Sequence, residues 1–306
     1  MSSDESKSKA VDIKKSENFI DWRIEFARIP PMIAIIIVHM LLNADYISPS
    51  ILSPFDWSLF ISITVFFYIS GHVQGLQYEY EEPGSLTKSE YIKHVKDRFL
   101  RLYPGYYLAL ISVFIAKVLA WIFVNKPLII TPWGLLLDLS SLTPILGIFG
   151  TEGAIWTVGW FVFAMFIVHL IYPFIRRLLS KGERNFYIII IASITFRILL
   201  AIFIPPAAYF FPLAWLTEFT IGIKVGKWSA TGGHKPPNKF QKIIIKMGKR
   251  IWAVYLIHMA PIAFITSGAT ASILEFVIIF IVIIILSELF YRLLKIVNGI
   301  INKKFK

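Results

Sequence analysis

Long apolar runs separated by short polar segments dominate the pattern along the chain. Nine runs occur, at roughly 29–43, 57–77, 102–124, 133–149, 155–175, 186–204, 208–227, 250–268 and 272–296. Several are long enough to cross a hydrocarbon core of ~30 Å as α-helices. We therefore predict an all-α fold, a polytopic transmembrane bundle formed by residues 19–300. A disordered cytoplasmic tail (1–18) precedes this single domain, and a basic cytoplasmic tail (301–306) follows it.

The run 133–149 is the weakest candidate span, because it contains Asp138, Pro144, two serines and two glycines. Counting it as a full span would place the basic residues of 176–185 on the opposite side from those of 78–101. Lys and Arg prefer cytoplasmic loops, so this arrangement is disfavoured. We predict a re-entrant or interfacial segment here, which leaves about eight full spans in a range of eight to ten. The alternative is that the segment pairs with another half-helix.

With eight spans, the charge of the loops alternates from one side of the membrane to the other. Loops rich in Lys and Arg are predicted to be cytoplasmic, as are both termini; they are 78–101, 176–185 and 228–249. Loops poor in cations are predicted to face the other side; they are 43–56, 125–132, 205–207 and 268–271. We expect a multi-pass protein of the plasma membrane with lipids as its surroundings.

Composition supports this class and removes others. The mean hydropathy is +0.68, and 57% of the residues are hydrophobic. The net charge of +12 is explained by the cytoplasmic loops and needs no nucleic-acid partner. With no cysteine in the chain, disulfides, thiolate metal sites and cysteine nucleophiles are excluded.

Arg28 and His39 are a cation and an imidazole at the start and in the middle of an apolar run. Ionisable residues inside a bilayer are expensive and mark functional sites. In a helix the two residues lie about 16 Å apart along the axis, so Arg28 is predicted near one membrane face and His39 near mid-bilayer. A polyanionic donor held at Arg28 would then extend its reactive end to a base inside. The alternative is a snorkelling Arg28 and a buried, hydrogen-bonded His39.

Two further segments break the apolar pattern near the predicted cytoplasmic face. Ser70 and Gly71 end the second span and permit close approach of a helix or a ligand, and His72 adds an ionisable group. Small residues in membrane helices usually serve packing. Arg98 and Arg101 share one helix face, and their guanidinium groups suit bidentate contact with phosphate. The alternative for this pair is an ordinary positive-inside anchor.

Histidines accompany aromatic residues in two later spans. The fifth contains Trp160 and His169, and the eighth contains Tyr255 and His258. A lone histidine among aromatic residues is more often structural than catalytic.

Arg197 and Glu218 are also buried by hydropathy, in the sixth and seventh spans. An unpaired charge there would be far more costly than a pair. We therefore predict that the two form an ion pair.

Taken together, these segments resemble the acyltransferase family 3 of integral membrane O-acyltransferases. Its members share Arg-X10-His in the first helix, Phe-Phe-X-X-Ser-Gly in the second and Arg-X-X-Arg-X-Tyr-Pro in the third. A Trp-Phe-Leu helix and a late Tyr-Leu-X-His segment follow. Here the motifs occur in the same order, as Arg28 with His39, Phe66 to Gly71, Arg98 to Pro104, Trp160 to Pro173 and Trp252 to His258. The resemblance covers about residues 19 to 296.

The resemblance implies transfer of an acyl group, usually acetyl, from cytoplasmic acyl-coenzyme A to a hydroxyl of a carbohydrate-like or lipid-linked acceptor, such as a cell-surface glycan. In this scheme His39 is the general base, with Arg28 and Glu25 at the reactive site. Arg98 and Arg101 bind donor phosphates, assisted by Arg28 and Ser70. Residues that line the substrate cavity are Tyr255, His258, His72 and Trp160.

The chain departs from the family pattern at two positions. Many members carry Glu five residues after the Trp of the fifth helix, where this chain has Met165, and a common Tyr is replaced by His169. These departures bear more on which acceptor the protein uses than on which donor it uses.

No metal site is predicted, because the six histidines are scattered without metal-ligand spacing. A proton-coupled secondary transporter is the alternative from another class, since carriers also use intramembrane His, Arg and Glu. A non-catalytic membrane scaffold is a further alternative. Release of free thiol from acyl-coenzyme A separates the enzyme from both.

Overall fold

The computed structural model describes residues 21–44, 54–76, 87–142, 159–230, 236–264 and 272–305, and all its elements in these ranges are helices. The first half contains α2 (Trp22–Ala27), α3 (Ile29–Asn43), α4 (Pro54–Leu76), α5 (Lys88–Val124) and α6 (Pro132–Ser140). The second half contains α8 (Trp160–Ser180), α9 (Glu183–Phe203), α10 (Pro205–Phe210), η3 (Pro212–Trp215), α11 (Leu216–Ala230), α12 (Lys239–Gly248), α13 (Ile251–Ile257), α14 (Met259–Ile262) and α15 (Ile273–Phe305). The predicted helical membrane bundle is confirmed.

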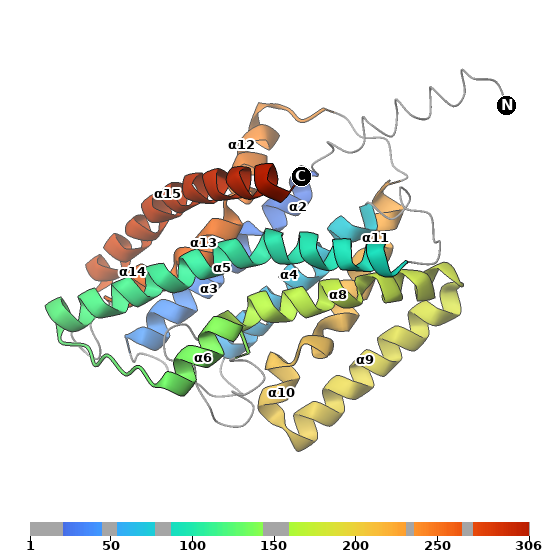
Figure 1. Ribbon diagram of the computed structural model, residues 1–306, viewed down its shortest axis with the longest axis horizontal. Coiled ribbons are helices and arrows are strands. Elements are labelled where there is room, and N and C mark those ends of the chain that lie inside the picture. The colour runs from blue at the N-terminus through green and yellow to red at the C-terminus, as the bar shows by residue number, and fades with distance from the viewer. Residues whose placement is uncertain are drawn as a thin grey trace.

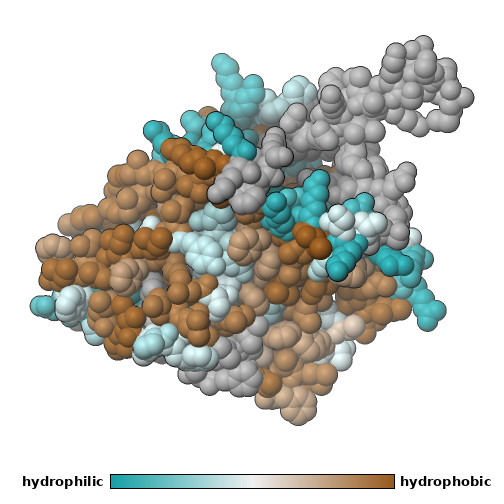
Figure 2. Space-filling view, in the orientation of Figure 1, coloured by the Kyte–Doolittle hydropathy of each residue, from teal (hydrophilic) through white to brown (hydrophobic). Residues whose placement is uncertain are grey.

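The helices run between two ends of the bundle that differ in charge. α4, α8, α11 and α15 finish toward the upper right of Figure 1, where α5 and α9 begin, and α2 and α12 lie at this end as well. Hydrophilic side chains gather there, whereas hydrophobic residues cover much of the remaining face (Figure 2). We call it the basic end because it carries Lys88, Lys93, Lys96, Arg176, Arg177, Lys181, Arg184, Lys227, Lys239, Lys242 and Lys246. The described parts of the three basic loops therefore share one end, as the charge pattern predicts.

Six helical stretches in the described ranges are long and apolar enough to cross a membrane: Trp22–Asn43, Trp57–Leu76, Lys88–Val124, Trp160–Ser180, Glu183–Phe203 and Ile273–Ile301. The two other predicted spans, 208–227 and 250–268, are divided into shorter helices. α10, η3 and α11 form one, and α13 and α14 form the described part of the other. Both segmented stretches run between the ends of the bundle (Figure 1). The total of eight spans stays a prediction.

The segment 133–149 is described only through residue 142. Its described part contains α6, a helix of nine residues, or about 14 Å, which cannot cross a core of ~30 Å. α6 packs on α5, where the Tyr106 hydroxyl donates to the backbone carbonyl of Asp138. Residues 143–149, including Pro144, lie outside the described residues.

Helix α5 begins well before the apolar run that predicts it. Thr87 caps the helix, and Glu90 completes a capping box by accepting from the Thr87 backbone N–H at 2.8 Å. The helix continues through Pro104 to Val124. The Arg98–Pro104 motif therefore lies inside one long helix and does not open a new one.

The first span is interrupted at Arg28, which ends α2 and precedes α3. Asp21 caps α2 by accepting from the Arg23 N–H at 2.9 Å. Pro30 and Pro31 lie at the start of α3, where a missing N–H is tolerated. Arg28 itself keeps right-handed helical backbone angles, and the following helix extends without a break to His39 and beyond.

Helices α4 and α11 meet backbone to backbone through two pairs of glycines. A Cβ atom at Gly71 would overlap the carbonyl oxygen of Phe219, and one at Gly222 would overlap that of Tyr68. Gly75 and Gly226 make equally close contacts one turn further along. Small residues spaced four apart allow membrane helices this approach. Gly71 thus serves packing, as small residues in membrane helices usually do.

A partly buried ion pair joins α9 to α11. Arg197 donates through two guanidinium nitrogens to the two carboxylate oxygens of Glu218, at 2.6 and 2.7 Å. It also donates to the carbonyl of Ala214 and lies 4.8 Å from the centre of the Trp215 ring. The predicted pair is confirmed, and its bidentate geometry offsets the cost of placing two charges among apolar helices.

Replacing Gly222 by valine should destabilise the protein by roughly 3 kcal/mol, since a side chain here must push α4 and α11 apart. We expect a clearly lowered Tm for Gly222→Val in detergent-purified protein. Gly299→Val is the matched control, because nothing lies within 4 Å of a Cβ at Gly299. Equal Tm values for the two variants would contradict the close helix contact.

The predicted topology can be tested with single cysteines, because the chain has none of its own. Lys181→Cys lies in the turn between α8 and α9 and should react with an impermeant maleimide only in inverted vesicles. Pro127→Cys and a cysteine at position 153, which lies outside the described residues, should react in intact cells. Labelling of position 181 in intact cells would instead place the basic end outside.

Candidate active site

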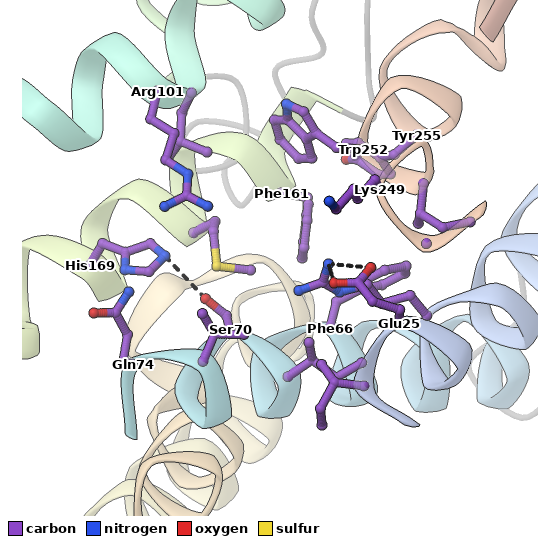
Figure 3. A pocket seen from close by; sticks show the side chains of 18 of the residues that line it. Glu25, Phe66, Ser70, Gln74, Arg101, Phe161, His169, Lys249, Trp252 and Tyr255 are labelled. Atoms are coloured by element: carbon purple, nitrogen blue, oxygen red, sulfur yellow. Dashed lines mark hydrogen bonds and ion pairs between the residues drawn. The ribbon is translucent and has the colours of Figure 1, made fainter. Parts of the chain in front are cut away.

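A cavity of about 530 Å³ opens at the basic end of the bundle. This volume lies within the range of small-molecule sites. Side chains from α2, α4, α5, α8, α13 and α15 line it (Figure 3). The cavity therefore collects residues from both halves of the sequence.

Cations outnumber carboxylates in the lining. The positively charged members are Arg28, Arg98, Arg101 and Lys249, and the acidic members are Asp21 and Glu25. Arg28 pairs with Glu25 at 2.9 and 3.0 Å through the two carboxylate oxygens. This ion pair restrains the Arg28 side chain. The remaining charges leave a cavity that favours an anion.

The two arginines of α5 project into this cavity, as their spacing predicts. Arg98 donates to the side-chain oxygen of Gln74 at 3.2 Å. Arg101 points into the cavity beside His169 (Figure 3). Within the described ranges, no carboxylate forms an ion pair with Arg101. Its guanidinium is thus well placed to contact an anionic ligand.

One face of α4 forms a wall of the cavity. Phe66, Ser70 and Gln74 recur every four residues and all line it. The Ser70 hydroxyl lies 3.1 Å from Nε2 of His169 on α8 (Figure 3). Gly71, next in sequence, faces α11 instead. The helix thus packs with one face and presents polar groups with the other.

Another wall of the cavity is largely aromatic. The ring of Phe161 lies 5.9 Å from that of Phe66 and 5.0 Å from that of Tyr255. Trp252 stacks on Tyr255 at 5.7 Å. Trp252 and Tyr255 belong to α13, and Lys249 lies beside Trp252 (Figure 3). The aromatic rings offer an uncharged surface to the part of a ligand that follows its anionic head.

His39 pairs with His258 beyond Tyr255. Nδ1 of His39 is 3.1 Å from Nε2 of His258, and the two rings are stacked with centroids 5.2 Å apart. Nδ1 of His258 in turn lies 2.6 Å from the carbonyl oxygen of Tyr255. Tyr255 lines the cavity, so the histidine pair adjoins it. His39 itself does not line the cavity, and its role as general base stays a prediction.

Three of the predicted cavity residues are not part of the lining. His72 is buried against α11, and its backbone lies close to Gly222 and Gly226. Trp160 begins α8 and packs its ring on Tyr209 at 5.0 Å. His258 is fully buried behind Tyr255. The lining does contain Arg28, Glu25, Ser70, Arg98, Arg101 and Tyr255.

Other lining residues were not expected from the sequence. Gln74 lies one turn after Ser70, so helical spacing would have been enough to find it. Lys249 gave no such signal, because it comes to the cavity with Gly248, which packs against Glu25 of the distant N-terminal segment. His169 stood out as a buried histidine, but its contact with Ser70 joins two separate helices. In the described parts of the chain, no group of three His, Asp or Glu residues is arranged to hold a metal ion.

Fold and cavity together define a helical membrane protein with an anion-accepting site. A family model described as an acyltransferase domain, that of acyltransferase family 3, matches residues 21–236. The protein belongs to this family and is a membrane acyltransferase. No curated protein and no solved structure matches the chain. The matched range includes Arg28, His39, Ser70, Arg98 and Arg101, whereas α13 and α15 lie beyond it.

Proposed function

We propose that the protein transfers an acyl group from acyl-coenzyme A to a hydroxyl group of an acceptor. The observation that carries this proposal is that one cavity is lined by both cations and aromatic rings. Its cations are Arg28, Arg98, Arg101 and Lys249, and its rings are Phe66, Phe161, Trp252 and Tyr255. Coenzyme A has two matching parts, phosphates at one end and an uncharged arm that ends in the thioester.

The donor phosphates pair with the arginines of α5 in this proposal. Guanidinium groups form bidentate, charge-assisted hydrogen bonds with phosphate oxygens. Arg28, held by Glu25, contacts the pyrophosphate or the start of the arm, and Ser70 offers a hydroxyl beside it. The arm extends along Phe66 and the other aromatic rings to Tyr255, so the thioester is brought toward His39.

His39 acts as general base on the acceptor hydroxyl. The hydroxyl proton passes to the imidazole while the oxygen attacks the thioester carbonyl carbon. The resulting tetrahedral intermediate loses coenzyme A when the C–S bond breaks. The thiolate takes the proton back from the imidazolium, so the products are an ester and a free thiol.

We further propose that the transferred group is acetyl and that the acceptor is a carbohydrate-like or lipid-linked hydroxyl at the cell surface. The basic end then faces the cytoplasm of a plasma-membrane protein, with both termini on that side, because coenzyme A is a cytoplasmic polyanion. Mass spectrometry of surface glycans and lipids from cells with and without the gene tests the acceptor. A mass difference of one acetyl group is the expected result.

Arg98→Ala/Arg101→Ala should raise the Kd for acetyl-coenzyme A at least about tenfold, since each charge-assisted bond contributes about 1.5–3 kcal/mol. Lysine at both positions should restore affinity only in part, because a point charge cannot make the bidentate contact. Isothermal titration of the detergent-purified protein measures both effects.

Two comparisons sharpen this experiment. Arg177→Ala/Arg184→Ala removes two exposed cations at the basic end that do not line the cavity, and it should leave the Kd unchanged. Acetyl-pantetheine lacks the nucleotide phosphates, so its affinity should not respond to the α5 substitutions. If both double substitutions weakened acetyl-coenzyme A binding equally, the α5 arginines would act only through the general positive charge of the surface and not through direct contact.

His39→Ala should lower the rate of acyl transfer by about 10²–10⁴-fold, the usual cost of losing a general base, while the Kd for acetyl-coenzyme A stays close to that of the unaltered protein. Release of free thiol in the presence of acceptor measures the rate. Near-normal turnover in this variant would leave His39 a structural residue. A protein that binds the donor and releases no thiol with any acceptor would favour a carrier or a scaffold.

A further inference from the structure

His258 contacts His39 across a sequence separation of 219 residues, and its protonation state follows from its own partners. Its Nδ1 is 2.6 Å from the carbonyl oxygen of Tyr255. A carbonyl oxygen only accepts hydrogen bonds, so Nδ1 of His258 carries a proton. The bond turns the ring back onto the last turn of α13 and fixes its orientation.

The other nitrogen of His258 must then be an acceptor. A neutral imidazole protonated on Nδ1 has a lone pair on Nε2. A second proton would create a charge in a fully buried position, where in the described ranges no carboxylate contacts the ring. Such a charge without a partner is costly. The neutral form with a free Nε2 lone pair is therefore favoured.

This assignment fixes the tautomer of His39. Nδ1 of His39 lies 3.1 Å from Nε2 of His258, and a hydrogen bond between them needs one proton. Since His258 accepts, His39 donates from Nδ1. The lone pair of His39 is then on Nε2, the nitrogen that points away from the pair.

We propose that His258 is a positioning residue that holds His39 as the Nδ1–H tautomer and leaves Nε2 as the base. The catalytic consequence rests on the proposed function, whereas the tautomer itself does not. When Nε2 of His39 takes the acceptor proton, Nδ1–H still donates to His258 and stabilises the imidazolium. The Tyr255 carbonyl thus orients the base through two imidazole rings, much as a carboxylate orients the histidine of a hydrolase triad.

The geometry is held by the packing of three elements. His39 lies on α3, and His258 lies at the break between α13 and α14. The flanking residues Leu256, Ile257 and Ala260 are buried in the core. Because both rings sit on packed helices, their separation does not depend on a mobile loop.

Two substitutions of His258 divide its functions. In His258→Gln the amide oxygen can reach the position of Nε2 and accept from His39. The shorter His258→Asn can keep a bond to the Tyr255 carbonyl but leaves His39 without an acceptor. We expect kcat for the Gln variant to stay within about tenfold of the unaltered protein. The Asn variant should lose roughly 10²–10⁴-fold, with little change in KM for acetyl-coenzyme A.

The tautomer is read directly by NMR of the full-length protein in detergent, with ¹⁵N-labelled histidine and His39→Ala to assign the signal. Protonated Nδ1 and unprotonated Nε2 on His39 are expected in the unaltered protein and in His258→Gln. A proton on Nε2 of His39 in the unaltered protein would overturn the proposal, as would equal kcat values for the Gln and Asn variants. If no variant turns over any acceptor, the proposed function fails, and the NMR result still decides the role of His258.

Discussion

The backbone-to-backbone contact between α4 and α11 fixes which face of α4 is left to line the cavity. Lipid tails are as apolar as leucine, so helices in a membrane gain little from hydrophobic association and depend on close packing. Gly71 and Gly75 of α4 provide it against Gly222 and Gly226 of α11. With one face of α4 committed in this way, Phe66, Ser70 and Gln74 are turned toward the cavity on another face.

Features with a local or energetic cause could be predicted from the sequence. Hydropathy gave the helical bundle, helical spacing placed Arg98 and Arg101 together, and the cost of isolated charges paired Arg197 with Glu218. Features created by packing of distant segments could not be predicted. Lys249 reaches the cavity through α12, and the contact between His39 and His258 has no periodic signal because it joins opposite ends of the chain.

The two histidine-bearing segments also show how the fold uses interrupted helices. α2 and α3 are separated at Arg28 before two prolines, and α13 and α14 are separated at His258 three residues before Pro261. Both residues keep right-handed helical backbone angles, with φ −78° and ψ −23° at Arg28 and φ −57° and ψ −31° at His258. Each ionisable residue therefore occupies a junction between two helices whose backbone stays helical.

The length of α5 has a consequence for how a charged ligand meets the protein. Its 37 residues extend about 55 Å, well beyond a hydrocarbon core of ~30 Å. Several turns therefore stand in the aqueous layer at the basic end, where Lys88, Lys93 and Lys96 are carried. An anion arriving from water meets this positive field before it reaches Arg98 and loses its hydration shell. Capture should accordingly slow as ionic strength rises, even though the inner contacts remain unchanged.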